Sequence, residues 1–368
     1  MGSVPFEAHS FFIFCVWGSG DIRLSGLGLH PMESGGGRVG DKFGSERRMY
    51  YFCTMALPLY FAPLQGYTDA VYRCAHASLF GGVTAYYTPF VRIEKGDFRR
   101  KDLRDIEPAH NAGVPTVPQV IASQPDELCR LVDKVAECGY RRIDINLGCP
   151  FPILVRRHKG SGLLPYPDEV ERLLRALEGY DGFTFSVKMR LGWESPDESL
   201  RLLPLLESAP VRQITLHARL GKQQYKGEPD REAFARFYEA CHLPLVYNGD
   251  LTTVADMVAM ELRFPRLAGL MLGRGLLATP WLAEAYANDG ALPPDRYERV
   301  ARLHEQVWNH YAEVSQGAHQ LLARMASFWE YLLPDVDKRL RKRVLKAHSV
   351  EAYTEAVQAL WLSIRESR

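Results

Sequence analysis

The sequence has no marked excess of charge of either sign and little that could associate with a membrane. Its 45 Lys and Arg residues and 44 Asp and Glu residues leave a formal net charge of +1. This balance excludes a uniformly basic nucleic-acid-binding protein, so any contact with nucleic acid must come from local patches. The apolar run at residues 11–17 has neither the length of a membrane span nor the flanks of a secretory signal, and we expect no membrane association.

The cysteines lack any paired motif. There are seven, widely scattered, with no C-x-x-C pair and no histidine at metal-ligand spacing. This pattern argues against a disulfide framework or a metal site and favours a reducing cytoplasm. Cys149 stands out because it follows a short strand pattern at 142–146, and parallel α/β folds place their chemistry at the carboxyl ends of strands. Taken alone, it is more often a small buried hydrophobe.

Residues 1–54 are rich in glycine and lack a sustained helical or strand period. We expect this segment to be disordered, or to be an extension ahead of a start at Met55. The chain becomes regular beyond it, with eight apolar, strand-like runs separated mostly by amphipathic helical stretches. These runs lie at residues 57–62, 83–88, 116–121, 142–146, 184–189, 213–217, 243–248 and 268–272.

Eight alternations of strand and helix within this length predict an α/β fold, a (β/α)8 TIM barrel over residues 55–290. A doubly wound sheet is the alternative, but the first strand is not followed by G-x-G-x-x-G. Residues 291–368 are predicted to form a small all-α domain, with helices at 296–314, 318–333, 336–347 and 350–367. The third of these helices carries six Lys and Arg residues without an acid between 338 and 346. Such a run is either a solvated face or a phosphate-binding surface.

Polar, Gly or Pro residues follow seven of the eight predicted strands, which a purely structural barrel does not require. They include Pro63, Gly66, Gln119, Asn146, Cys149, Lys188, Arg190, His217, Asn248, Gly249, Asp250, Gly273 and Arg274. The loops after the last two strands often bind phosphate in such barrels, and here they offer glycine backbone and one guanidinium. Lys188 and His217 indicate a flavin, because an inward cation can stabilise the reduced ring. A surface lysine and a core histidine are the alternatives.

Several motifs occur together in a characteristic order. They are 62–69 (APLQGYTD), Gln119, 146–150 (NLGCP), 160–167 (GSGLLPYP), 187–192 (VKMRLG), 217–219 (HAR), 248–250 (NGD) and 273–275 (GRG). With them, the sequence from about Leu57 to Leu360 resembles the tRNA-dihydrouridine synthase family. The resemblance implies an FMN-dependent oxidoreductase that reduces a D-loop uridine in tRNA with electrons from NADPH, and we expect a monomer.

The resemblance also assigns site residues. It implies that Cys149 donates a proton to C5 of the uracil while the flavin delivers hydride to C6. A thiol can do this because it is largely protonated at neutral pH. The FMN-binding residues implied are Ala62, Pro63, Leu64, Gln119, Lys188, His217, Asn248, Gly249, Asp250, Gly273 and Arg274. The substrate contacts expected are Asn146, Arg190, Arg339 and Arg343.

The sequence departs from the family in the loop after Cys149. Many relatives carry a lysine three residues after the cysteine, where this chain has Pro152. Arg156, Arg157 or Lys159 are the candidates to replace it. Residues 92–101 add five basic residues as further candidate RNA contacts.

Three other functions are alternatives. A dihydroorotate dehydrogenase type of flavin barrel is distinguished by activity on free dihydroorotate. A non-catalytic tRNA-binding protein would be colourless when purified. An aldolase with a Schiff base on Lys188 is excluded by a yellow, flavin-containing protein.

Overall fold

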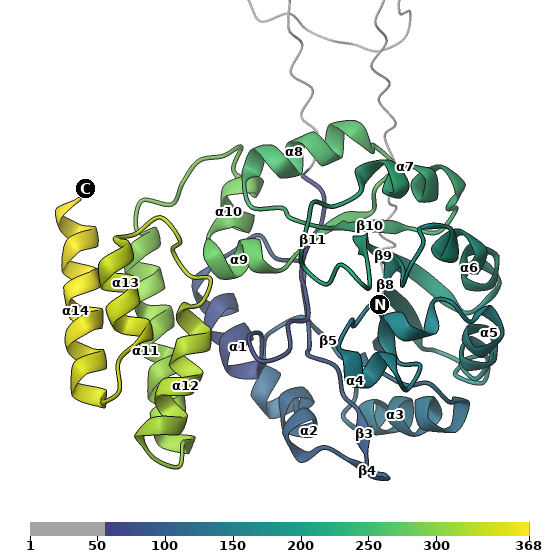
Figure 1. Cartoon of the computed structure of the whole chain (residues 1–368), viewed down its shortest axis with the longest axis horizontal. Helices are drawn as coiled ribbons and strands as arrows, with labels where there is room; N and C mark the ends of the chain where they lie inside the picture. The colour runs from purple at the N-terminus through teal and green to yellow at the C-terminus, as the bar shows by residue number, and fades with distance from the viewer. Residues whose placement is uncertain (1–55, 368) are drawn as a thin grey trace, which may run out of the picture. The chain divides into compact units, whose positions relative to one another are not determined.

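The computed structural model describes residues 56–367, which belong to one compact unit. The expectations for residues 1–54 and for a start at Met55 fall outside the described residues. Figure 1 shows a ring of strands surrounded by helices, with a further group of four helices, α11–α14, beside it. The domain boundary at 290/291 stays a prediction, because the helical group packs closely on the barrel.

All eight predicted strands are present, and all ladders of their sheet are parallel. They are β1 (Leu59–Phe61), β2 (Ala85–Tyr87), β5 (Thr116–Val117) with β6 (Gln119–Val120), β7 (Arg142–Leu147), β8 (Thr184–Gly192), β9 (Val211–Leu220), β10 (Leu245–Asn248) and β11 (Gly269–Leu272). The third predicted strand is divided in two by Pro118, which cannot donate a ladder hydrogen bond. Its first half pairs with β2 and its second half with β7, so the sheet closes into a barrel.

The helices around the barrel bury one apolar face each. They include α1 (Ala70–Leu79), α3 (Pro125–Glu137), α5 (Pro167–Arg175), α6 (Asp197–Ser208), α7 (Arg231–Ala240) and α8 (Val254–Arg263). Proline at the first helical position begins α3 and α5, where its missing N–H costs nothing. Thr253 and Asp256 form a reciprocal capping box on α8. Signals of this kind mark where a helix begins in the sequence.

The four helices at the C-terminal end are α11 (Arg296–Val314), α12 (Ala318–Trp329), α13 (Lys338–Leu345) and α14 (Val350–Glu366). The predictions for α12 and α13 were too long by several residues. Leu332 and Leu333 are buried, but Leu333 has a φ of 47°, which no α-helix allows. Their apolar pattern therefore belongs to a buried connection, and the Asp337 carboxylate caps α13.

Two side-chain contacts fasten this helical group to the loop that follows β1. The Tyr311 hydroxyl of α11 donates to Oδ2 of Asp69 at 2.7 Å, while Oδ1 of the same carboxylate caps α1. The Tyr67 hydroxyl donates to Glu330 at 2.7 Å. The helical group therefore helps to shape the carboxyl-terminal rim of the barrel. Within residues 56–367, none of the helices combines the length and apolarity that crossing a membrane requires.

Candidate active site

A cavity of about 630 Å³ opens at the carboxyl-terminal rim of the barrel. Nine of the eleven predicted cofactor residues line it, namely Ala62, Leu64, Lys188, His217, Asn248, Gly249, Asp250, Gly273 and Arg274. Pro63 and Gln119 are not among its lining residues. The helical group supplies part of the wall, through Glu330, Tyr331, Pro334 and Arg341. The site is thus shared by the barrel and the helices, which strand-exit patterns alone could not reveal.

The floor of the cavity is cationic. The Lys188 ammonium donates to Oδ1 of Asn248 at 2.9 Å, and Nδ2 of Asn248 donates to the Met271 carbonyl at 2.8 Å. Burial, followed by the nearby Arg190 charge, lowers the pKa of Lys188 to about 8. The group is therefore mostly protonated at neutral pH and can stabilise negative charge in the cavity.

His217 is held in one tautomer. Nη1 of Arg219 lies 3.3 Å from Nε2 of His217, and a guanidinium can only donate, so Nε2 accepts and the ring proton lies on Nδ1. Burial and the surrounding cations keep the pKa of His217 well below its ordinary value. His217 is therefore a neutral donor at physiological pH.

Asp250 orients two guanidinium groups. Arg219 binds both of its oxygens, at 2.8 and 2.6 Å, and Arg274 binds Oδ1 at 2.6 Å. Burial alone would raise the pKa of Asp250, but its hydrogen bonds with Arg219 and both charges hold it below the usual range. Asp250 is thus occupied as an acceptor, and Arg274 remains the group suited to bind an anion.

Cys149 lies on a turn that is fixed from several sides. Oδ1 of Asn146 accepts hydrogen bonds from the Gly148 and Cys149 amides at 3.0 and 2.8 Å. The Cys149 carbonyl accepts from the hydroxyl and the amide of Ser161, both at 3.0 Å. A side chain on Gly160, whose φ is 61°, would place Cβ 2.6 Å from the Cys149 carbonyl oxygen, so the loop can approach this closely only with glycine.

The thiol of Cys149 is half-buried, and it stays protonated at neutral pH. Burial raises the pKa of Cys149 above its ordinary value, although the backbone at Phe151 and the nearby Arg190 and Lys188 act in the opposite direction. A protonated thiol is a proton donor and a poor nucleophile. The environment of Cys149 therefore suits acid catalysis rather than covalent catalysis.

Arg190 and Asn146, both predicted to contact substrate, are engaged within the protein. Arg190 is 1% exposed and donates to the carbonyls of Gly148, Leu220 and Gln224. It therefore joins the Cys149 turn to the loop after β9. Substrate contact by these two residues stays a prediction.

Three residues of the site were not assigned from the sequence. Arg219 was quoted in a motif, but its ion pair with Asp250 joins two strand exits and leaves no periodic signal. Tyr225 is 50% exposed, and the guanidinium groups of Arg190 and Arg274 lie 5.5 and 5.2 Å from its ring centre. Arg341 belongs to the basic run, yet it is turned inward and donates to the Trp329 and Glu330 carbonyls.

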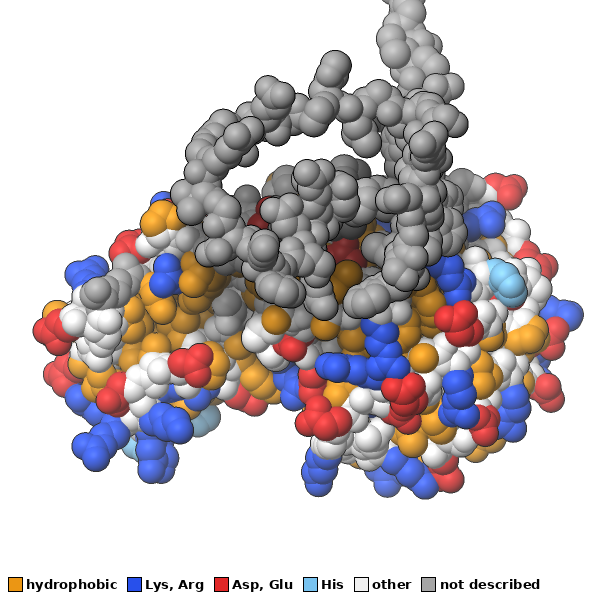
Figure 2. Space-filling model, turned by 90° about the horizontal axis from the view of Figure 1, so that it is seen from above, with side chains coloured by type: hydrophobic (Ala, Val, Ile, Leu, Met, Phe, Trp, Pro, Cys, Tyr) orange, Lys and Arg blue, Asp and Glu red, His pale blue; other side chains and the backbone are white. Residues whose placement is uncertain are grey.

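The remaining basic residues of α13 face solvent. Arg339 and Arg343 are exposed, as are Lys338, Lys342 and Lys346. Figure 2 shows Lys and Arg side chains gathered along one edge of the helical group, at the left of the view. In residues 92–101, Arg92 and Arg99 have acidic partners, Glu94 and Asp102.

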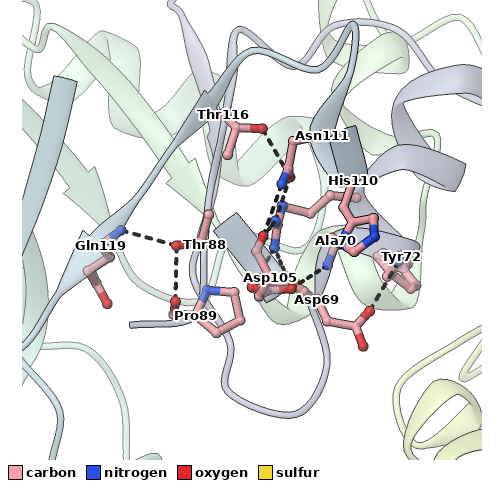
Figure 3. A network of polar contacts seen from close by, with 12 residues as sticks. Asp69, Ala70, Tyr72, Thr88, Pro89, Asp105, His110, Asn111, Thr116 and Gln119 are labelled. Atoms are coloured by element: carbon pink, nitrogen blue, oxygen red, sulfur yellow. Dashed lines mark hydrogen bonds and ion pairs between the residues drawn. The ribbon is translucent and has the colours of Figure 1, made fainter. Parts of the chain in front are cut away.

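A buried ion pair fixes the position of the loop after β1, which supplies Ala62 and Leu64 to the cavity. Arg73 of α1 is fully buried and binds the Thr68 carbonyl at 2.7 Å, Asp105 at 3.1 Å and Asn111 at 2.7 Å. Asp105 also accepts from the Ala70 amide (Figure 3). Removing one member of such a pair leaves an uncompensated charge and costs about 3–5 kcal/mol.

The fold and site together define a parallel α/β-barrel protein with a cavity at its carboxyl-terminal rim that is lined by Lys188 and Arg274. Cys149 is not among the lining residues, but the charge of Lys188 acts on its thiol. A family model described as "Dihydrouridine synthase (Dus)" matches residues 60–356, so the chain belongs to the dihydrouridine synthase family.

Among curated relatives, tRNA-dihydrouridine synthase B of Pasteurella multocida is 29% identical over 61% of this chain and 67% of the relative. A probable tRNA-dihydrouridine synthase of Rhodobacter capsulatus is 31% identical over 61% and 69%. The Proteus vulgaris tRNA-dihydrouridine synthase B is 26% identical over 81% and 93%.

Proposed function

We propose that this protein is a tRNA-dihydrouridine synthase, which reduces the C5–C6 bond of a D-loop uridine in tRNA. The observation that carries the proposal is the placement of a protonated thiol, Cys149, on a fixed turn next to Lys188 and Arg190 at the rim of the barrel. The family match over residues 60–356 and the names of the three relatives support the choice of substrate.

The cofactor we propose is FMN, with NADPH as the electron donor. The donor set fits this group, because Arg274 and the backbone at Gly249 and Gly273 suit a phosphate, while Lys188 and His217 suit the polar edge of a flavin. When bound, FMN supplies the hydride that reaches C6 of the uracil. Lys188, Asn248 and His217 hold their positions through hydrogen bonds within the protein.

Cys149 is proposed as the acid. Its Sγ–H transfers a proton to C5 of the uracil, and the thiolate that remains must be reprotonated from solvent before the next turnover. The nearby charge of Arg190 acts to lower the pKa of Cys149, so it also stabilises that thiolate. Because the pKa of Cys149 is raised, the thiol stays protonated through the neutral pH range. Turnover should therefore not vary with thiol ionisation in that range.

The RNA would be held by charge and shape. A uridine in folded tRNA must leave its stack before it can reach a barrel cavity, so the enzyme has to bind the surrounding phosphates. The exposed residues Arg339 and Arg343 are suited to this. We further propose a monomer and a cytoplasmic location, and the five free cysteines among residues 56–367 agree with the location.

The test is dihydrouridine formation in tRNA isolated from a strain that lacks the gene, with NADPH and the purified protein. Wild-type protein is expected to be yellow and active. Cys149→Ala is expected to keep FMN and tRNA binding and to lose most turnover, whereas Cys138→Ala, at a half-buried position after α3, is a matched control that should stay active. Full activity of Cys149→Ala would exclude the proposed acid, and activity on free dihydroorotate alone would exclude the tRNA substrate.

A further inference from the structure

A chain of hydrogen bonds between four buried polar side chains links the neighbouring strands β6, β7 and β8 and ends at the Cys149 turn. Ser186 on β8 donates to Oδ1 of Asp144 at 2.6 Å. Nε2 of Gln119 donates to Oδ2 of Asp144 at 2.6 Å. Nδ2 of Asn146 then donates to Oε1 of Gln119 at 2.7 Å, and Oδ1 of Asn146 accepts from the Gly148 and Cys149 amides.

Each link in this chain has a fixed direction. The two turn amides can only donate, so Asn146 must present its oxygen to them and its NH2 group to Gln119. Gln119 must then present its oxygen to Asn146 and its own NH2 group to residue 144. An ionised carboxylate can only accept, and Asp144 therefore enforces the direction of both amides.

The burial of a carboxylate at this position lowers the stability of the folded protein. Asp144 is fully buried, and burial raises its pKa to about 6 in spite of both hydrogen bonds. Since the pKa is raised above the unfolded value, this group lowers folding stability as the pH rises from about 4 to about 6. A neutral side chain of similar shape would avoid that cost, so folding stability alone does not account for a carboxylate at this position.

We propose that Asp144 is a positioning residue for the reaction, which acts through Gln119 and Asn146 to hold the Cys149 turn in its reactive geometry. The Asp144 side chain is fully buried and both of its oxygens are bound by Gln119 and Ser186, so it acts indirectly. The inference rests on the proposed role of Cys149. In this proposal Gln119 and Asn146 hold the Cys149 turn even when neither substrate nor cofactor is bound.

The test reverses the direction of the hydrogen bonds made by Gln119. Asn146→Asp still accepts from the turn amides, but it leaves Gln119 between two carboxylates with only one NH2 group to offer them. Asp144→Asn in the same molecule supplies the missing donor, because its NH2 group can face Oε1 of Gln119 while its oxygen accepts from Ser186. The double variant is therefore satisfied throughout, with the Gln119 amide reversed.

We expect Asn146→Asp to reduce kcat by about a hundredfold, as misplacement of a reacting group by about 1 Å does. The kcat of the double variant should be at least tenfold higher than that of Asn146→Asp alone. Asp144→Asn alone should cost about threefold, because Ser186 can accept from the new amide and only the enforced direction is lost. If Asn146 acts only by touching the uracil, the second substitution at a buried site cannot restore activity, and that result would overturn the proposal.

A second readout separates this inference from the proposed function. The rate at which iodoacetamide alkylates Cys149, followed by mass spectrometry, reports the turn geometry without tRNA or NADPH. It should change in Asn146→Asp and return toward wild type in the double variant. Unchanged alkylation in all variants would refute the positioning role, even if wild-type protein forms dihydrouridine. If wild-type protein forms none, the alkylation series still decides the role of Asp144. Asn146→Asp could fail to fold. In that case, a double variant that restores neither the melting temperature nor the alkylation rate would also contradict the proposed hydrogen-bond chain.

Discussion

At the scale of single residues, Lys188 is a cavity group whose charge changes slightly above neutral pH. Its pKa of about 8 means that the ammonium is charged below this pH and neutral above it. A neutral amine stabilises an anionic ligand less well, so the affinity of the FMN-free protein for FMN should fall as the pH rises from 7 to 9. Flavin fluorescence titrations at several pH values measure this directly.

Lys188→Met provides the control for that prediction. It should bind FMN more weakly at pH 7, by about tenfold for the loss of one charged hydrogen bond, and its affinity should vary less with pH. A pH dependence as steep as that of wild type would show that another group is responsible.

Residues at strand exits could be predicted from the sequence, whereas those joined only in space could not. The positions of Lys188, His217 and Arg274 followed from strand periodicity, because parallel strands end at one rim. Arg219 and Arg341 were missed, since the first acts through an ion pair between neighbouring strands and the second reaches the cavity from the helical group. The engagement of Arg190 with backbone carbonyls was equally invisible, because its partners lie in separate loops.

At the scale of elements, the short helix after Cys149, α4 (Pro152–Val155), presents an exposed apolar surface. Phe151 and Ile153 are 53% and 48% exposed, and Arg156 and Arg157 beside them face solvent. Aromatic groups interleaved with cations bind unpaired bases by stacking, worth about 1–3 kcal/mol per base. The lysine expected after Cys149 is thus replaced by a surface suited to stacking.

We therefore expect Phe151→Ala to raise the KM for tRNA by at least about fivefold, which corresponds to about 1 kcal/mol, with little change in NADPH oxidation without tRNA. Phe151→Trp should retain wild-type KM. Leu262→Ala removes a side chain that is 77% exposed at the end of α8 and serves as the matched control. Equal KM values for Phe151→Ala and Leu262→Ala would rule out stacking at this position.

At the scale of the whole molecule, the helical group has two sides with different roles. The sequence alone could not tell which residues lie on which side. The barrel-facing side of the group closes the cavity through Tyr331 and Arg341 and is tied to the loop after β1 through Tyr311 and Glu330. Exposed basic residues of the group, among them Arg339 and Arg343, lie on α13. The helical period predicted the helices, but only their packing distinguishes the inward Arg341 from its exposed neighbours.

This division predicts different outcomes for neighbouring arginines of α13. Arg339→Glu with Arg343→Glu should weaken tRNA binding while FMN content and the melting temperature stay near wild type, because both side chains are exposed. If each contacts one phosphate, the slope of log affinity against log salt concentration should decrease by about two. Arg341→Ala should instead lower the melting temperature and FMN content, since it breaks hydrogen bonds to two carbonyls at the cavity wall.

The control reverses two exposed charges away from the rim, Arg172→Glu with Arg212→Glu, which lie on α5 and at the amino-terminal start of β9. This pair changes the net charge by the same amount, so a general electrostatic effect would weaken tRNA binding equally in both double variants. Affinity measured by filter binding between 50 and 200 mM salt separates the two cases. A loss confined to the α13 pair would assign the phosphate contacts to that helix, whereas equal losses would leave α13 as an ordinary solvated face.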